Sequence, residues 1–425
     1  MSIADLAIVA ALVFGWGALS ARLERFDVTA PIVFVLAGLL LTHGPLAVLG
    51  FTPSDELIKT LAEFTLALVL FSDASRVGLH ELRADSGLYL RLLGVALPLT
   101  IALGTVLALA LMGTSIWLAL LVGAALAPTD AALGSGMMGN PVVPARIRRL
   151  INVESGLNDG IATPFVSVAL AGAAGSHAAH GPAAAVAELA VGVLVGVAAG
   201  GAGGLLVNAA RRRGWAAEGF GGAAVLGLAV CAYASAVAVH GNGFIAAFVA
   251  GLAFGTASGR RGEPLVPFVE ETGALVSLLV WLAFGAVELV PALESLTWQM
   301  VLYAILSLTV IRMVPVLVAL TGARLDWATS ILVAWFGPRG LASVVFALLA
   351  LEELGRPAAG SAVALITVTV VLSIVAHGAT AEPLARRYAN RLTRPAAGST
   401  DVQPPDMPDR RLIRRTGRGG ITPQG

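Results

Sequence analysis

Long apolar stretches alternate with short polar loops along most of the chain. A helix needs about 20 apolar residues to cross a bilayer, and a helix satisfies its own backbone hydrogen bonds there. The pattern therefore predicts an all-α polytopic membrane protein with about thirteen transmembrane helices. The apolar stretches lie near residues 3–20, 30–42, 57–72, 88–112, 115–136, 150–174, 183–207, 220–240, 243–257, 272–290, 298–320, 328–350 and 360–382.

Basic residues indicate which loops lie on the same side of the membrane. The loops after stretches 1, 3, 5, 7, 9 and 11 hold fourteen arginines, whereas those after the even-numbered stretches hold only Lys59 and Arg356. Cytoplasmic loops carry an excess of Lys and Arg. The alternation therefore predicts an N-terminus outside the cell and a C-terminus in the cytoplasm, as expected for a multi-pass protein of a bacterial inner membrane.

The composition excludes several classes of protein. Hydrophobic residues make up 57% of the 425 and charged residues 12%, which excludes a soluble enzyme and a chain that is mostly disordered. A single cysteine, Cys231, excludes a disulfide scaffold. Residues 386–425 hold nine Arg and three Asp, so this segment is predicted to be a disordered, basic cytoplasmic tail. The chain has no Walker pattern, which argues against ATP-driven transport.

Two of the apolar stretches are interrupted at their middles. The fifth breaks at Ala127-Pro128-Thr129-Asp130, and the twelfth breaks at Phe336-Gly337-Pro338-Arg339-Gly340. Proline removes a helical hydrogen bond and bends the helix. Thirteen alternating spans divide into two inverted six-helix repeats around one connector, which pairs the fifth stretch with the twelfth. Matching breaks in inverted repeats indicate the binding site of a transporter.

The sixth stretch carries polar side chains at a depth where they are costly. Ser155 and Asp159 are four residues apart and share one face of the helix, which Thr163 extends. Glu154 and Asn158 form the neighbouring stripe. Carboxylate, hydroxyl and carbonyl oxygens suit a hard alkali cation. The pattern predicts a cation site at Asp159; a buried polar network that only joins helices is the alternative.

A charge at the depth of Glu154 needs a partner of opposite sign. Two arginines are candidates, namely Arg312 in the eleventh stretch and Arg339 at the break of the twelfth. The residues alone leave this choice open.

The breaks themselves carry further candidates. Thr129 can offer its carbonyl and its hydroxyl oxygen, and Asp130 follows it directly. The ends of broken helices bear partial charges of about half a unit, which Asp130 and Arg339 are expected to compensate. Asp73 ends the third stretch and is either a further ligand or a solvated acid paired with Arg76.

At these residues the sequence resembles the monovalent cation:proton antiporters. It is similar to the electroneutral sodium/proton exchanger branch, which includes the bacterial NhaP-like and the mammalian NHE proteins. The resemblance covers residues 1–385. It rests on the stretches 127–130, 154–160, 240–243, 310–314 and 337–340.

The resemblance implies an architecture. It implies a homodimer whose protomers each have a mobile core part, residues 88–174 and 298–382, and a dimerisation part, residues 1–72 and 183–290. The fifth and twelfth helices would cross at their breaks inside the core. The tail from residue 386 lies outside this transporter domain.

The resemblance also implies roles for the site residues. Asp159 would bind either the cation or the proton, and Thr129, Ser155 and Asp130 would complete the alkali-metal site. Asn158 would support Asp159. Glu154 and Arg312 would form a structural ion pair. Relatives with Asn before the essential Asp are electroneutral, so a one-for-one exchange is implied.

The function expected from these features is secondary antiport of Na⁺ for H⁺, serving sodium transport and pH homeostasis. Cation and proton would compete for Asp159, and only the loaded forms would change sides. A K⁺/H⁺ antiporter of the same fold is the main alternative. A cation channel and an intramembrane aspartyl protease built on Asp130 and Asp159 are remote ones. The protein is not expected to be an enzyme, to need a cofactor, or to bind nucleic acid or ATP.

Overall fold

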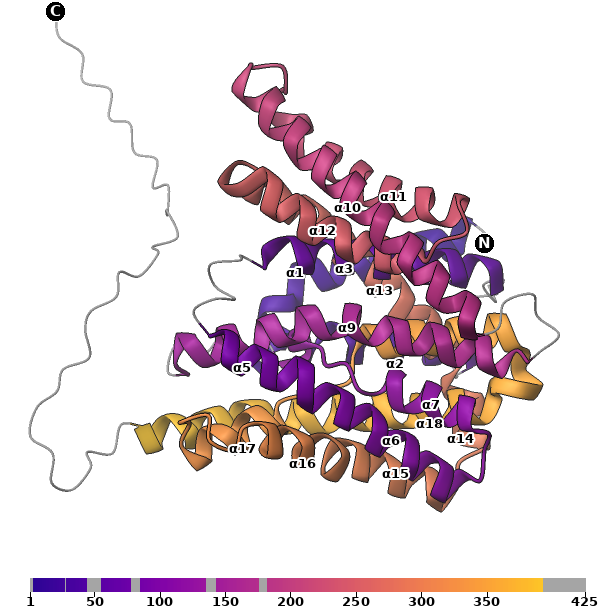
Figure 1. Ribbon diagram of the computed structural model, residues 1–425. Coiled ribbons are helices and arrows are strands. Elements are labelled where there is room, and N and C mark those ends of the chain that lie inside the picture. Colours follow the sequence, from indigo (N-terminus) through magenta and orange to yellow (C-terminus); the bar gives the residue numbers. More distant parts are fainter. Residues whose placement is uncertain are drawn as a thin grey trace, which may run out of the picture.

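The protein is described by a computed structural model that covers residues 3–26, 28–43, 55–77, 85–134, 143–175 and 182–392. Helices are the only regular elements in these ranges (Figure 1). The α-helices are α1 (Ile3–Leu23), α2 (Ala30–His43), α3 (Asp55–Arg76), α5 (Ser86–Arg91), α6 (Leu97–Met112), α7 (Ile116–Ala125), α9 (Ala145–Ala173), α10 (Pro182–Arg212), α11 (Gly221–Ala238), α12 (Gly243–Ser258), α13 (Val266–Val287), α14 (Leu289–Glu294), α15 (Trp298–Leu308), α16 (Val310–Ala319), α17 (Trp327–Trp335) and α18 (Leu341–Leu392).

Short turns of other helix types join some of these helices. A π-helical segment, η2 (Leu92–Ala96), links α5 to α6, and 3₁₀ turns are η1 (Glu24–Phe26), η3 (Ala131–Gly134), η4 (Glu218–Phe220), η5 (Gly259–Arg261) and η6 (Glu263–Leu265).

Within the described ranges, seven helical segments are long and apolar enough to cross a membrane. Three shorter apolar helices, α2, α7 and α12, accompany them. The protein is thus an all-helical, multi-pass membrane protein, while the count of thirteen spans stays a prediction. The disordered tail is predicted to start at residue 386, but α18 continues to Leu392. The rest of the predicted tail, residues 393–425, lies outside the described residues.

Several predicted spans are divided or joined in the structure. The eleventh consists of α15 and α16, which meet at Thr309. The segment α18 consists of two helices, the second half of the twelfth stretch and the thirteenth, which meet at a kink where Gly355 adopts φ 73°. A side chain rarely tolerates that backbone conformation, so glycine permits the sharp bend there.

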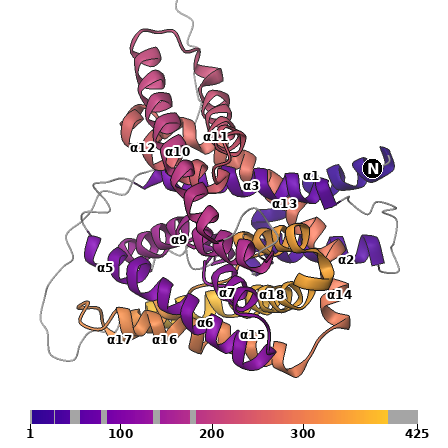
Figure 2. The same cartoon turned by 45° about the vertical axis from the view of Figure 1, so that its right-hand side comes forward.

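The helices form two groups (Figures 1 and 2). In one, α3 and α13 pack against each other, with α2 on α13 and with α10 and α12 stacked beyond α3. In the other, α6, α7 and α9 pack together with α15, α16 and α18. Contacts of α18 with α3 and of α9 with α10 join the groups.

Small residues allow α10 and α12 to approach closely. Gly192, Gly196 and Gly200 lie one turn apart on α10 and face backbone carbonyls of α12 and of its N-cap residue, Asn242. A methyl group on Gly200 would overlap the backbone of Ala250. Close backbone contact of this kind stabilises helix pairs in lipid, where burial of apolar area contributes little.

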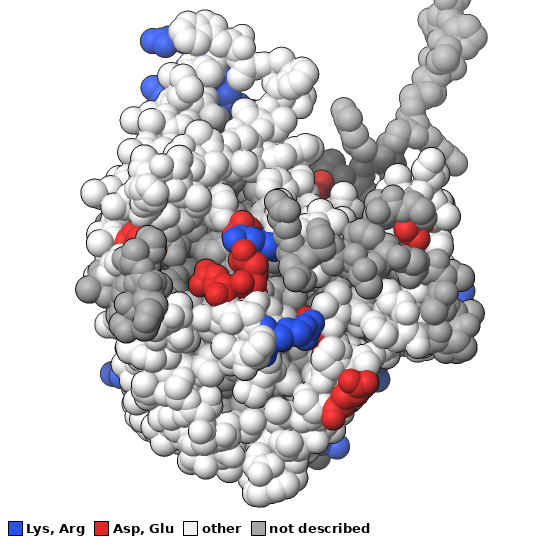
Figure 3. All heavy atoms as spheres, turned by 90° about the vertical axis from the view of Figure 1, so that its right-hand side faces the viewer, with Lys and Arg blue, Asp and Glu red and all other residues white. Residues whose placement is uncertain are grey.

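Charged side chains are sparse on the face shown in Figure 3. Acidic and basic groups gather together near its middle, and basic groups lie on the part that projects at the top. Two ion pairs tie the helix groups to each other: Lys59 of α3 to Glu352 of α18 at 2.6 Å, and Arg356 of α18 to Glu288 at 2.9 Å.

Candidate functional site

Two extended segments meet inside the second helix group. α7 ends at Ala125, and α17 ends at Trp335 before α18 begins at Leu341. The backbone N–H of Asp130 donates to the carbonyl of Pro338 at 2.8 Å. Gly340 has no room for a side chain, because an added Cβ would overlap the Asp130 side chain. The interrupted helices therefore contact each other directly at their breaks, and we call this contact between residues 126–130 and 336–340 the crossing.

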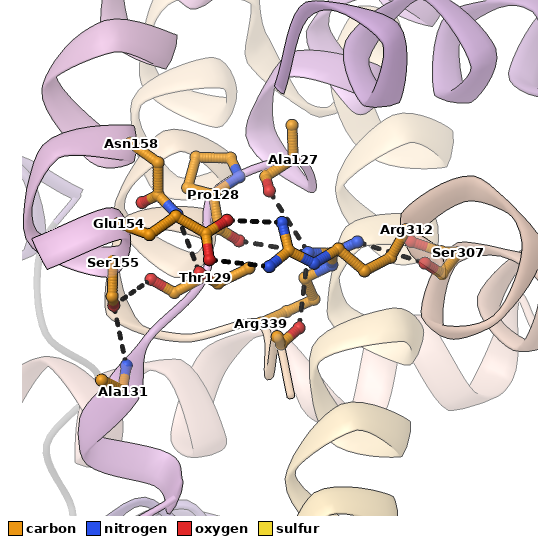
Figure 4. A network of polar contacts seen from close by, with 11 residues as sticks. Ala127, Pro128, Thr129, Ala131, Glu154, Ser155, Asn158, Ser307, Arg312 and Arg339 are labelled. Atoms are coloured by element: carbon orange, nitrogen blue, oxygen red, sulfur yellow. Dashed lines mark hydrogen bonds and ion pairs between the residues drawn. The ribbon is translucent and has the colours of Figure 1, made fainter. Parts of the chain in front are cut away.

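The crossing carries charges of both signs at the helix ends. The Arg339 guanidinium is fully buried and donates to the carbonyls of Ala127 at 3.2 Å, Pro128 at 3.4 Å and Ser307 at 3.1 Å (Figure 4). Carbonyls at the C-terminal end of a helix bear partial negative charge, which a cation stabilises.

Asp130 lies at the opposite kind of helix end. Its Oδ2 accepts from the backbone N–H of Leu341 at 3.3 Å, at the N-terminus of α18. A carboxylate is favourable there because the first N–H groups of a helix lack partners.

Glu154 of α9 and Arg312 of α16 form a buried ion pair. Nη1 lies 2.7 Å from Oε1, and Nη2 donates to Oε2 at 3.0 Å. Their side chains are 2% and 1% exposed. Figure 4 shows the Glu154 carboxylate facing the guanidinium in this two-point geometry. Of the two arginines left open by the sequence, Arg312 is thus the direct partner.

Thr129, Ser155 and Asn158 form one hydrogen-bond network on the other side of the crossing (Figure 4). The Ser155 hydroxyl donates to the Thr129 carbonyl at 2.6 Å and accepts from the N–H of Ala131 at 2.8 Å. The Asn158 amide donates to the Thr129 hydroxyl at 2.7 Å. The network attaches the broken segment after α7 to α9, and it uses the oxygens that the sequence offers as ligands.

Asp159 lies next to this network and is partly exposed. Among the described residues, none is recorded as donating a hydrogen bond to its carboxylate or pairing with it. Asp130 and Asp73 are close enough to act on it electrostatically. Thr163, on the same stripe, donates its hydroxyl to the Asp159 backbone carbonyl at 2.8 Å, so this hydroxyl is already engaged.

Asp73 reaches the site from the other helix group. It lies on α3 directly against Gly156 of α9, where an added Cβ would be 3.1 Å from the Asp73 Cβ. Arg76, the partner considered for it, instead forms a two-point ion pair with Glu270 of α13, with one contact at 2.7 Å. The structure therefore places Asp73 beside the α9 polar stripe, between the two helix groups.

The described residues hold no cluster of three or more His, Cys, Asp or Glu that could bind a resident metal ion. The site instead combines three partly exposed carboxylates, Asp159, Asp130 and Asp73, with neutral groups and one buried ion pair. Such an arrangement suits transient binding of a monovalent cation or a proton.

Comparison with known proteins decides the family. Residues 8–387 match the family of transmembrane sodium/hydrogen exchangers. The chain belongs to the sodium/hydrogen exchanger family.

The fold is that of a solved exchanger. The sodium proton antiporter MjNhaP1 from Methanocaldococcus jannaschii superposes with a TM-score of 0.73, covering 91% of this chain and 99% of that one at 18% identity. At this identity the likeness shows the fold alone.

Two sequence relatives are longer proteins, and this chain matches only part of each. An uncharacterized Na(+)/H(+) exchanger of Mycobacterium bovis is 30% identical over 211 residues, which is 49% of this chain and 36% of that protein. The K(+)/H(+) antiporter NhaP2 of Shewanella oneidensis is 24% identical over 382 residues, which is 87% of this chain and 64% of that protein. This chain thus matches about a third of the length of the first exchanger and less than two thirds of the second.

The structure adds groups to this exchanger's crossing that the sequence did not single out. The Ser373 hydroxyl of α18 accepts from the backbone N–H of Arg339 at 2.7 Å, and the Ser343 hydroxyl donates to the Ala125 carbonyl at 2.6 Å. The Tyr303 hydroxyl donates to the Gly104 carbonyl at 3.1 Å. Small hydroxyl residues in an apolar stretch are a weak sequence signal of a functional site, because many of them hydrogen-bond only to the backbone of their own helix. Their roles depend on which backbone groups the breaks leave without partners.

Proposed function

We propose that this protein exchanges Na⁺ for H⁺ across the membrane, with both ions competing for the carboxylate of Asp159. The observation that carries the proposal is the difference between the acids around the crossing. Glu154 is paired with Arg312, and Asp130 accepts from the N-terminus of α18. Asp159 is partly exposed beside them, and no hydrogen bond or ion pair to its carboxylate is recorded among the described residues.

The chemistry follows if Asp159 is the carboxylate that alternates between the two ions, with Asp73 acting only as a further ligand. A bound proton or a bound Na⁺ each neutralises Asp159, so the two loaded forms have the same net charge. An empty, charged site near the middle of a membrane is costly to move. Only loaded forms would therefore change sides, and the gradient of one ion would drive the other uphill.

The polar network beside Asp159 would complete the cation site. In this arrangement the Thr129 carbonyl, the Thr129 hydroxyl and the Ser155 hydroxyl all lie at the break, held by Asn158 and Ala131. A cation would take the place of some of these hydrogen bonds. Asp73, pressed against Gly156, is proposed as a further oxygen ligand reaching in from α3.

The same reasoning supports the architectural proposals. The helix group that holds the crossing would be the moving core, and the group of α2, α3 and α10–α13 with α1 would form the dimerisation part of a homodimer. Two inverted six-helix repeats would place α7 and α17–α18 as counterparts. The Arg-rich loops would lie in the cytoplasm with the C-terminus, and the N-terminus would lie outside.

K⁺ in place of Na⁺ is the second candidate, supported by the similarity to the K(+)/H(+) antiporter NhaP2 over 87% of this chain. Both cations would use the same oxygens.

The test uses everted membrane vesicles in which a dye reports the pH difference. Li⁺, Na⁺ and K⁺ are added in turn to the wild-type protein, to Asp159→Asn and to Asp85→Asn. Asp85 directly precedes the first residue of α5 and pairs with Arg146 at 2.6 Å, so its variant is a matched control away from the crossing. Wild-type and control proteins should collapse the pH difference on addition of Na⁺. Asp159→Asn should not, although it elutes normally in size-exclusion chromatography. A normal response in Asp159→Asn would refute the site, and a response to K⁺ alone would select the second candidate.

A further inference from the structure

A cavity separate from the crossing lies between the C-terminal ends of α10 and α12. Its volume is about 420 Å³, and it is lined by Asn208, Thr256, Ala257, Ser258, Gly259 and Arg261. We call it the α10–α12 pocket. Both helices end here beside the Arg-rich loops.

Positive charge converges on the pocket. Arg261 donates through Nη1 to the Oδ1 of Asn208 at 3.0 Å, and Arg211 donates to the Arg261 carbonyl at 2.5 Å. The two guanidinium groups keep further N–H donors, and the Asn208 amide uses its oxygen toward Arg261 and keeps its NH₂ group as a donor. Donors of this kind recognise the oxygens of an anion.

Several other arginines of the protein have carboxylate partners. Arg76, Arg146 and Arg356 each pair with a carboxylate. Within the described part of the chain, no ion pair to a carboxylate is recorded for Arg211 or Arg261. The positive potential at the pocket is therefore not offset by such a pair, and it favours an anionic ligand.

Exposed aromatic side chains at this end are those expected at a membrane surface. Trp215 is 69% exposed and lies under the guanidinium of Arg213, 4.8 Å from its ring centroid. Phe220, at the start of α11, is 76% exposed. Tryptophan and basic residues are typical of the level of the lipid headgroups. Figure 2 shows this end as the part that projects at the top, and Figure 3 shows basic side chains on that part.

The surface below the pocket is apolar. Leu205 lies three residues before Asn208 on α10, about 60° from it around the helix, and is 64% exposed. An anion in the pocket would thus continue into a surface suited to hydrocarbon chains. A free phosphate ion would leave this surface unused.

We propose that the α10–α12 pocket binds the phosphate group of an anionic phospholipid, whose acyl chains lie along the face of α10 that carries Leu205. Arg211, Arg261 and the Asn208 amide donate to the phosphate oxygens. The lipid joins the ends of α10 and α12, which the glycine contacts already hold together along their length. Binding at this pocket is independent of ion exchange at Asp159.

The experiment is native mass spectrometry of the purified full chain with equal amounts of phosphatidylglycerol and phosphatidylcholine of the same acyl chains. The wild-type protein should retain phosphatidylglycerol preferentially. The double variant Arg211→Gln/Arg261→Gln should lose that preference by about tenfold, because two charge-assisted hydrogen bonds are removed. Arg22→Gln, at an exposed arginine on the last turn of α1, is the matched control and should bind as the wild type does.

A second arm separates the lipid from a free anion. Inorganic phosphate alone should not raise the thermal stability, whereas phosphatidylglycerol should raise it in the wild type and not in the double variant. Equal retention of the two lipids by the wild type, undiminished retention by the double variant, or equal protection by inorganic phosphate would overturn the proposal. If the double variant fails to elute as a single species, Arg211→Gln alone serves, with an expected loss of about threefold.

Discussion

The ion pair between Glu154 and Arg312 should be the most sensitive point of the fold. Glu154→Gln keeps the size of the side chain and removes its charge. Arg312 then stays buried with Arg339 nearby as a second guanidinium. Both contacts of the pair, at 2.7 Å and 3.0 Å, lie in a region where the side chains are at most 2% exposed.

The expected cost is large for a single substitution. Breaking a buried pair by removing one partner costs about 3–5 kcal/mol, because the other charge is left without compensation. A ΔΔG of this size corresponds to a fall in Tm on the order of 10 °C for a chain of a few hundred residues. An exposed pair contributes only ~0–1 kcal/mol.

The assay is thermal unfolding of the purified protein in detergent, followed by tryptophan fluorescence. Glu382→Gln is the matched control, since the pair of Glu382 with Arg386 is 31% and 73% exposed. Glu154→Gln should lower the Tm far more than the control does, and it should change the apparent cation affinity of the surviving protein less. Equal melting temperatures for Glu154→Gln, Glu382→Gln and the wild type would refute the reasoning.

Three further predictions follow from the crossing and from one helix end. If Asp159 alone alternates between ions, exchange in proteoliposomes should not respond to a potassium diffusion potential set by valinomycin, although one moved charge would otherwise contribute about 2.3 kcal/mol per 100 mV; a sustained transport current would indicate a second proton site. Gly340→Ala should abolish exchange and destabilise the fold by about 1–3 kcal/mol, because its Cβ overlaps Asp130. Gly360→Ala on the same helix, which has open space around it, should retain both exchange and stability. The Asp326 cap of α17 accepts from the side chain and backbone of Thr329, and the side-chain bond lowers the pKa of that carboxyl. Its stabilisation is therefore present at neutral pH and lost as the pH falls through the folded-state pKa, so Asp326→Ala should lower the Tm at pH 7 and have little effect near pH 3.

The sequence by itself determined where the helices lie and where two of them break. Apolar stretches predict helices well in a membrane protein, because lipid offers the backbone no other hydrogen-bond partner. The breaks at Pro128 and Pro338 were readable for a local reason too, since proline cannot continue the helical bonding pattern. Spacing alone also placed Ser155 and Asp159 on one helix face.

Only the tertiary structure decided which groups meet. Glu154 pairs directly with Arg312 rather than Arg339 because α9 and α16, 158 residues apart in the chain at these positions, place those side chains face to face. Arg76 pairs with Glu270, which leaves Asp73 against α9. Burial and distance set the energy of a charge, and both depend on how separate helices pack. A pattern along one helix contains no such information.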